Sequence, residues 1–290
     1  MRSSRVVVAV VILLAATAVT PASVAFAGRA SSAALELAAP TAQTKIPAVK
    51  LPPVNGRFDY QIGGAYAPAP GVAIVDRDRS DSPAPGKYNI CYINAFQSQP
   101  EDAWFWRSKH PDLLLKHGGK PVTDPGWPGE YILNTSTVAT RSKIAAIVDP
   151  WIAGCVAKGF QAVEPDNLDS WTRSRNLLTE SDNLAFVTLI ARYAHSRGLA
   201  IAQKNTGQLG NKGKVTAKLD FAIAEECQLY SECATYTGPY GRHVIEIEYT
   251  DNPRSAYTQA CAGQGRFISV ILRDRLVVAR GQTGYHYEYC

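Results

Sequence analysis

The sequence predicts a barrel of the (β/α)8 TIM type, and three observations carry that prediction. From about residue 55 onward, short apolar runs alternate with helical patterns, which is typical of a parallel sheet whose strands are joined by helices. Eight such runs fit into about 230 residues, close to the size of a single α/β barrel. No GxGxxG pattern follows the first run, which argues against an open dinucleotide-binding sheet.

The expected strands follow one another along the chain. A ninth short run at Tyr131–Leu133 is expected to lie outside the main sheet. The first two strands are only about ten residues apart and Pro-rich residues 67–70 separate them, so a helix does not fit there and the barrel is expected to be irregular near its start. The eight strands are predicted at Phe58–Ile62, Val72–Val75, Tyr88–Ile93, Gln161–Glu164, Leu199–Ala202, Leu219–Ala224, His243–Glu248 and Phe267–Leu272.

Helical patterns fill the longer gaps. The clearest helix runs from about Ser181 to Arg197, because Thr179 or Ser181 can cap it, Phe186 and Ile190 mark an apolar face, and Gly198 ends it. A second helix is predicted from Ile144 to Lys158, with a break at Pro150. A third is predicted from about Arg254 to Ala262.

Three segments divide the chain. Residues 1–27 are interpreted as a signal peptide, because two arginines precede an apolar run too short for a membrane span and Ala25-Phe26-Ala27 offers a cleavage site. Residues 28–54 are rich in Ala, Pro, Ser and Thr and are predicted to be a flexible leader. Residues 55–290 form the predicted catalytic barrel. Because of the predicted signal peptide, we expect a secreted, extracellular chain with no membrane association after cleavage.

Charge and composition limit the classes of partner that we expect for this protein. The formal net charge is +5 and falls to +3 without residues 1–27, which hold two arginines and no acid. No stripe of Lys and Arg with interleaved aromatics occurs, so nucleic acid is not expected as a partner. The histidines show no metal-ligand spacing, and neither a metal nor a cofactor is predicted. We expect the protein to act as a monomer.

Six cysteines remain after cleavage, and an even number in an exported chain indicates disulfides. Fifteen connectivities are possible. Cys227 and Cys233 are close enough to close a small loop, and Cys261 is the expected partner of Cys290. Cys91 and Cys155 are the other two.

Polar side chains gather where the predicted strands end. In an α/β barrel the active site is built at the carboxyl ends of the strands. Several acids that each directly follow an apolar strand indicate a glycosidase, because glycosidic bond cleavage needs one carboxyl group as proton donor and another as nucleophile or base. The candidate site residues at these ends are Asp59, Gln61, Tyr92, Asn94, Glu164, Asp166, Asn167, Lys204, Asn205, Glu225, Glu226, Glu248 and Tyr249.

Two further features leave alternatives open. Trp104 and Trp106 lie after the third strand and either stack on sugar rings or pack in the core. Lys204 either pairs with a carboxylate or binds a substrate hydroxyl.

The chain resembles glycoside hydrolase family 114, the endo-α-1,4-polygalactosaminidases, over roughly residues 56–290. The run Gly-Phe-Gln-Ala-Val-Glu-Pro-Asp-Asn at 159–167, together with the segment Glu225-Glu226-Cys227 to Glu232-Cys233, is the most specific part of the resemblance. Four shorter stretches fit as well: Phe58-Asp59-Tyr60-Gln61, Cys91-Tyr92-Ile93-Asn94, Ala202-Gln203-Lys204-Asn205 and Glu248-Tyr249.

The resemblance implies a (β/α)8 barrel that cuts α-1,4-linked galactosamine or N-acetylgalactosamine polymers internally. It places the catalytic pair on Asp166 and Glu225, and the other candidate site residues become substrate-binding. The strand positions resemble those of barrel α-galactosidases, which implies a retaining reaction with Asp166 as nucleophile and Glu225 as acid/base. Ala224 stands where many family members carry Asn, a departure expected to alter substrate preference.

The implied substrate is a cationic polysaccharide, which a rim of carboxylates would attract. Three other functions remain open at this point: a sugar-binding barrel without catalysis, a hydrolase of a different α-linked glycan, and a metal-dependent deacetylase. The sequence leaves undecided whether the amine or the acetamide sugar is preferred.

Overall fold

The computed structural model describes residues 48–290. The predicted signal peptide and most of the predicted leader, residues 28–47, lie outside this range. Residues 48–54 were also expected to be flexible, but Val49 and Leu51 pack against apolar side chains of the barrel. The hydroxyl of Tyr88 donates to the carbonyl of Lys50 at 2.6 Å. This end of the leader is therefore fixed, because its two apolar side chains find a buried partner.

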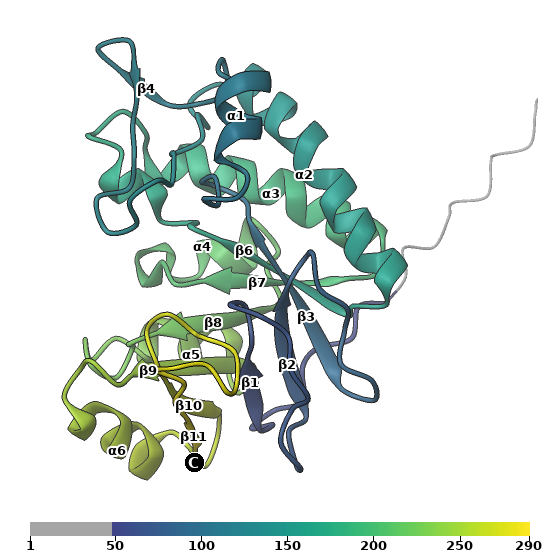
Figure 1. Ribbon diagram of the computed structural model, residues 1–290, viewed down its shortest axis with the longest axis vertical. Helices are drawn as coiled ribbons and strands as arrows, with labels where there is room; N and C mark the ends of the chain where they lie inside the picture. The colour runs from purple at the N-terminus through teal and green to yellow at the C-terminus, as the bar shows by residue number, and fades with distance from the viewer. Residues whose placement is uncertain (1–47) are drawn as a thin grey trace, which may run out of the picture. The chain divides into compact units, whose positions relative to one another are not determined.

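The sheet contains the eight predicted parallel strands, each pairing with the next one along the chain, apart from the seam between the last and the first (Figure 1). The ninth run, Tyr131–Leu133, forms only isolated bridges outside this sheet, as predicted. The TIM-type barrel is thus confirmed. Its parallel strands are β1 (Phe58–Tyr60), β2 (Ile74–Asp78), β3 (Tyr88–Asn94), β6 (Ala162–Asp166), β7 (Ala200–Lys204), β8 (Phe221–Glu225), β9 (Val244–Tyr249) and β10 (Ser269–Arg273).

A short antiparallel strand lies at the seam between the last and the first parallel strand. This strand, β11 (Tyr287–Tyr289), pairs with β10. The hydroxyl of Tyr287 donates to the carbonyl of Phe58 in β1 at 2.7 Å. An isolated parallel bridge joins Gly63 to Val278 nearby. The barrel is therefore nearly closed, and side-chain contacts complete the closure.

Helices cover the outside of the sheet. Between β1 and β2 the described chain contains no helix, which confirms the irregular start. The helices are α1 (Ala103–Lys109), α2 (Val138–Lys158), α3 (Glu180–Ser196), α4 (Lys212–Val215), α5 (Ala234–Tyr240) and α6 (Arg254–Gly263), with 3-10 turns at Ser170–Arg173 and Gly207–Leu209; a two-stranded hairpin, β4 (Lys116–His117) and β5 (Lys120–Pro121), precedes α2.

Helix α2 corrects one prediction, because it runs unbroken through Pro150 and begins six residues earlier than expected. Thr137 caps its start by accepting a hydrogen bond from the amide of Thr140. Pro150 is exposed, as is Ala146, whose carbonyl loses its helical partner to the proline. Solvent can satisfy that carbonyl, and the opposite face of the helix stays packed on the sheet through Ile144, Val148 and Ile152.

The core has two layers that follow the alternation of side chains along each strand. One layer fills the barrel interior with residues such as Phe58, Ile90, Phe221 and Ile247. The other lies between the strands and the helices. This alternation decides which polar residues at the strand ends face the barrel axis.

Three disulfides fasten the outer layer. Cys91 of β3 is bonded to Cys155 of α2, and Cys227 to Cys233 in a short loop after β8. Cys261 of α6 is bonded to Cys290, next to β11. Both expected pairings are therefore confirmed. Within the described residues, no helix is long and apolar enough to cross a membrane.

Candidate active site

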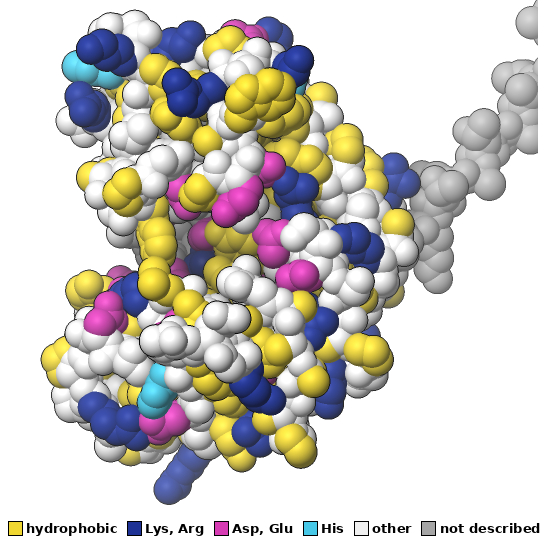
Figure 2. Space-filling model, in the orientation of Figure 1, with side chains coloured by type: hydrophobic (Ala, Val, Ile, Leu, Met, Phe, Trp, Pro, Cys, Tyr) yellow, Lys and Arg dark blue, Asp and Glu magenta, His cyan; other side chains and the backbone are white. Residues whose placement is uncertain are grey.

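A cavity of about 530 Å³ opens at the carboxyl ends of the parallel strands. Figure 2 shows acidic side chains gathered around a hollow in this face of the molecule. Six acids and three basic residues line it, so its formal charge is negative although the chain is basic. The lining includes Tyr60, Tyr92, Asp124, Trp127, Glu130, Asp166, Asn167, Asp169, Arg173, Lys204, Asn205, Glu225, Glu226, Tyr249 and Arg275.

Lys204, at the end of β7, forms the floor of the cavity and is only 2% exposed. Its Nζ atom lies 2.7 Å from Glu164, 3.1 Å from Asp166 and 3.5 Å from Glu225. Burial alone would lower the pKa of Lys204, but the surrounding carboxylates raise it well above its usual value. Lys204 is therefore a permanent cation that pairs with carboxylates, the first of the two roles open from the sequence.

Asp166, the last residue of β6, is held by three donors. The hydroxyl of Tyr92 donates to one oxygen at 2.6 Å, and the amide of Asn167 donates to the other at 2.7 Å. Lys204 contacts that second oxygen. Burial alone would raise the pKa of Asp166, but Lys204 and these hydrogen bonds outweigh it and lower the pKa. Asp166 is therefore an ionised carboxylate.

Glu225, the last residue of β8, faces the same floor. The hydroxyl of Tyr249 donates to one of its oxygens, and the side chain of Asn205 donates to the other at 2.8 Å. The amide of Glu225 donates back to Asn205 at 2.8 Å. Asn205 and Asn167 both take a left-handed backbone, with φ of 46° and 65°, which asparagine tolerates better than most residues. This conformation turns the chain sharply after each strand.

Glu164 does not line the cavity as a substrate-binding residue would. It is fully buried beneath Lys204, where it also accepts a hydrogen bond from Tyr60 at 3.1 Å. Below it lies Asp76 of β2, also fully buried. Burial raises the pKa of Asp76 well above its usual value, and the neighbouring Glu164 raises it further. Burial also raises the pKa of Glu164, although Lys204 and the contact with Asp76 act to lower it. These two acids support Lys204 from below.

A polar wall rises beside Asp166. Asn167 lines the cavity, and its side-chain amide donates to Asn94 at 2.9 Å. Asn94 does not line the cavity itself but donates to Glu130 at 3.1 Å. Arg173 contacts Asp124 at 2.5 Å and Asp169 at 2.9 Å. The wall therefore combines predicted residues with four that the strand-end pattern did not reveal.

On the opposite side, Glu226 is held by Arg275 at 2.6 Å and by the side chain of Asn252. The guanidinium group of Arg275 also lies over the ring of Tyr249, 4.1 Å from its centroid. Arg275 follows β10 and is a further residue that sequence reasoning missed.

Asp59, Gln61 and Glu248 were predicted to bind substrate, but they do not line the cavity. Their neighbours Tyr60 and Tyr249 face it, and successive side chains of a strand point to opposite faces. Asp59 accepts a hydrogen bond from Tyr66 at 2.6 Å, and Gln61 accepts one from Arg77 at 2.9 Å. The same alternation places Ala224 in the layer beneath the helices, so it cannot contact a ligand in the cavity.

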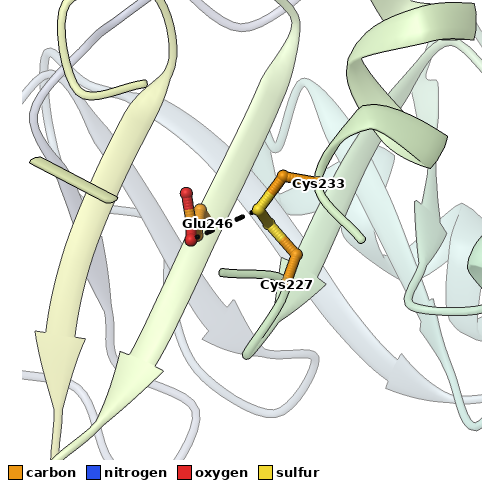
Figure 3. A group of neighbouring side chains, drawn as sticks. All are labelled: Cys227, Cys233 and Glu246. Carbon is orange, nitrogen blue, oxygen red and sulfur yellow. Dashed lines mark hydrogen bonds between the residues drawn. A yellow bond between two sulfur atoms is a disulfide. The ribbon is translucent and has the colours of Figure 1, made fainter. Parts of the chain in front are cut away.

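Glu248 belongs to a separate buried cluster with Glu246. Glu246 lies next to the Cys227–Cys233 disulfide (Figure 3). Glu246 accepts a hydrogen bond from the amide of Gln228, and Glu248 accepts from the amides of Gln228 and Leu229. The Sγ atom of Cys233 lies 3.5 Å from Glu246. Because the two sulfur atoms are bonded to each other, this group does not offer thiolates to a metal. It fastens the loop that follows Glu225 and Glu226.

The structure decides between the two roles left open for Trp104 and Trp106. Trp106 is fully buried in the core, and Trp104 is 66% exposed but does not line the cavity. Trp127 lines it instead and is 47% exposed. Trp127 and Glu130 belong to an irregular loop, which offers no periodicity that a sequence reading could use.

Comparisons with known proteins give a family match and similar folds. The model of glycoside-hydrolase family GH114 matches residues 38–290. A comparison with curated protein sequences finds no match.

Among solved structures, Ega3 of Aspergillus fumigatus, crystallised in complex with galactosamine, is similar with a TM-score of 0.66 and 24% identity. The alignment covers 85% of this chain and 100% of Ega3. The glycoside hydrolase domain of PelA from Pseudomonas aeruginosa is similar with a TM-score of 0.53 and 12% identity, covering 78% of this chain and 97% of that domain. At these identities the two structures establish the fold.

Proposed function

The chain belongs to glycoside-hydrolase family GH114 and is thus a glycoside hydrolase, and from that premise we propose that it cleaves α-1,4-linked galactosamine polymers internally by a retaining mechanism. The observation that carries the proposal is the position of Lys204 between Asp166 and Glu225 on the floor of an acidic cavity. The match to Ega3, which was crystallised with galactosamine, supports the choice of sugar.

The distances support retention. Because Lys204 Nζ is 3.1 Å from Asp166 Oδ1 and 3.5 Å from Glu225 Oε2, these two oxygens are at most about 6.6 Å apart. Retaining glycosidases hold their carboxyl groups about 5–5.5 Å apart, whereas inverting ones need about 6.5–9.5 Å to admit a water molecule between carboxylate and sugar. The two oxygens that face Lys204 are therefore no farther apart than the lower end of the inverting range, which favours retention.

In the proposed reaction, Asp166 attacks the anomeric carbon while Glu225 gives a proton to the leaving glycosidic oxygen. The bond to that oxygen breaks, and a glycosyl ester forms on Asp166. Glu225 then takes a proton from water as the water attacks the same carbon and releases Asp166. The lowered pKa of Asp166 fits the nucleophile, which must be ionised before attack.

The charge of the cavity supports a cationic substrate. Galactosamine carries an ammonium group at neutral pH, and six acids against three basic residues favour binding a cation. We further propose that the mature chain is exported after cleavage near Ala27 and acts as a monomer; mass spectrometry of the secreted protein and light scattering test these two points.

Three other functions compete. A non-catalytic sugar-binding barrel would not need two carboxyl groups held at this separation by one buried lysine. A metal-dependent deacetylase would need a cluster of free ligands, and the one candidate cluster among the described residues contains disulfide sulfurs. A hydrolase of another α-linked glycan would share the carboxyl pair but would gain nothing from the acidic lining.

The deciding experiment is product analysis on partially deacetylated poly-α-1,4-galactosamine. We expect wild type to release oligosaccharides of several lengths, whose anomeric NMR signals first appear in the α form. Asp166→Asn should release none while keeping the same unfolding temperature. A folded wild type that releases only acetate, or binds without products, would overturn the proposal.

A further inference from the structure

The acids that line the cavity are not equivalent, because all but one already have a cationic partner. Asp166 and Glu225 lie near Lys204, Asp124 and Asp169 contact Arg173, and Glu226 contacts Arg275; all of these N–O distances are 3.5 Å or less. Glu130 has no Lys, Arg or His nitrogen within 4.0 Å in the part of the chain that the structure describes. Among these six acids, Glu130 is therefore the one without a direct cationic partner in the described residues.

Glu130 is fixed in relation to Asp166 by a chain of hydrogen bonds. One of its oxygens accepts from the side chain of Asn94 at 3.1 Å, and Asn94 accepts in turn from Asn167 at 2.9 Å. Asn167 directly follows Asp166, to which its amide donates. The other oxygen of Glu130 receives no hydrogen bond from the described residues, and the side chain lines the cavity. The free oxygen is thus available to a ligand beside the proposed nucleophile.

The loop that carries Glu130 is held at both ends. The amide of Glu130 donates to the carbonyl of Trp127 at 3.1 Å, and the amide of Asp124 donates to the carbonyl of Glu130 at 3.0 Å. Trp127 lines the same cavity, so the loop presents a flat apolar ring next to a carboxylate. A sugar that bears an amino group offers the complementary surfaces: a face of C–H groups for the ring and a cation for the acid.

An isolated carboxylate in this position is costly. Burial raises the pKa of Glu130 to about 7, the charge of Asp166 adds to the effect, the hydrogen bond from Asn94 opposes it, Asp124 raises it further and Arg173 lowers it. A ligand cation would favour the ionised form and remove this cost. An acetamido group in the same place would leave it unrelieved.

We propose that Glu130 binds the 2-ammonium group of a galactosaminyl unit beside Asp166 and thereby makes this enzyme prefer the amine sugar over the acetamide sugar. This rests on the proposed function, because it assigns a contact within the same cavity. Glu130 is a specificity-determining residue: the bond is cleaved by other groups, and the selectivity comes from the charge that Glu130 adds.

The test compares Glu130→Gln, Glu130→Asp and wild type on two matched substrates, fully deacetylated and fully N-acetylated α-1,4-galactosamine oligosaccharides. Glu180→Gln is the control, since Glu180 pairs with the exposed Lys212 and does not line the cavity. We expect Glu130→Gln to lower kcat/KM on the amine substrate about tenfold, mainly through KM, and to leave the acetamide substrate within twofold. Glu130→Asp should recover part of the loss.

Two results would overturn the inference. An equal loss on both substrates would make Glu130 a structural residue, and a loss in kcat on both, with one limb of the pH profile removed, would make it an acid or base of the reaction. If wild type cleaves neither substrate, the proposed function fails. Calorimetric titration with galactosamine and N-acetylgalactosamine trisaccharides then decides on Glu130 separately, since only tighter binding of the amine that is lost in Glu130→Gln supports it.

Discussion

The ammonium group of Lys204 lies 3.1 Å from Asp166, and Lys204 is only 2% exposed to solvent. The pair sits at the centre of a group that also contains Glu164 and Glu225. Because one cation serves three carboxylates, its removal should affect the charge state of Asp166 more than the shape of the cavity.

The first prediction concerns Lys204→Met, which keeps the length of the side chain and removes the charge. Lys204 contributes to the lowered pKa of Asp166, so its loss should raise that pKa. The acid limb of the kcat/KM profile should move to higher pH, and activity at neutral pH should fall by about 10²-fold. Lys212→Met, at an exposed lysine, is the control. An unchanged acid limb in a folded variant would contradict the assignment.

The second prediction separates the two carboxyl roles. Glu225→Ala and Asp166→Ala should each lose about 10³-fold or more in kcat on the polymer. On a substrate with an activated aryl leaving group, which departs without a proton, added azide should rescue Glu225→Ala by attacking the glycosyl ester on Asp166, which gives a product of retained α configuration. Azide should give the inverted β-glycosyl azide with Asp166→Ala, because it then replaces the nucleophile. NMR of the two products checks the assignment, and a reversal of the two stereochemical outcomes would exchange the roles.

The third prediction concerns pH and the buried acids Glu246 and Glu248. Burial and the charge of Glu248 raise the pKa of Glu246 from 4.5 to about 8. Between pH 4.5 and about 8 the unfolded chain ionises Glu246, while the folded chain keeps it protonated. The contribution of Glu246 to stability is therefore fully present below pH 4.5 and is lost as the pH rises through 8. The slope from this one group is at most about 1.4 kcal/mol per pH unit.

Glu246→Gln removes that titration and keeps a donor next to Glu248. We expect the variant to match wild type near pH 5 and to be the more stable of the two at pH 8. Urea unfolding at both pH values measures the difference, with Glu101→Gln at an exposed position as control. A constant difference across the range would show that Glu246 ionises normally in the folded protein.

The fourth prediction compares two disulfides. The Cys91–Cys155 bond closes a sequence separation of 64 and Cys227–Cys233 one of 6, so the chain-entropy model gives contributions of about 4 and about 2 kcal/mol. Replacing each pair by alanine should therefore destabilise the first variant more. The variant without the Cys227–Cys233 bond should lose more activity than the other, because the loop 227–233 directly follows Glu225 and Glu226. Unfolding and kcat/KM measured on both variants decide; the same order in both would contradict the prediction.

The sequence predicted the barrel well because its strands are short apolar runs with polar ends, and strand ends converge in this fold. Asp166, Lys204 and Glu225 were found by this rule. Asp59, Gln61 and Glu248 were misplaced by it, because the rule marks the strand end and alternation then decides which of two neighbours faces the axis. Glu130, Trp127 and Arg275 come from irregular loops, whose paths depend on tertiary contacts that no local pattern encodes. The helix break predicted at Pro150 is wrong, because a proline breaks a helix only where solvent and packing do not compensate for the lost hydrogen bond.

The hydrogen bond from Tyr287 to Phe58 joins residues 229 apart in the sequence. Contacts of such separation form late in folding, because the entropy of a long loop is lost before the contact is gained. Until the last part of the chain around β10 and β11 docks against it, the first strand keeps an uncovered edge that can pair with another chain. Refolding of this protein should therefore be slow and sensitive to protein concentration. The yield of refolded protein should improve more on dilution than with substitutions that stabilise the residues around the cavity.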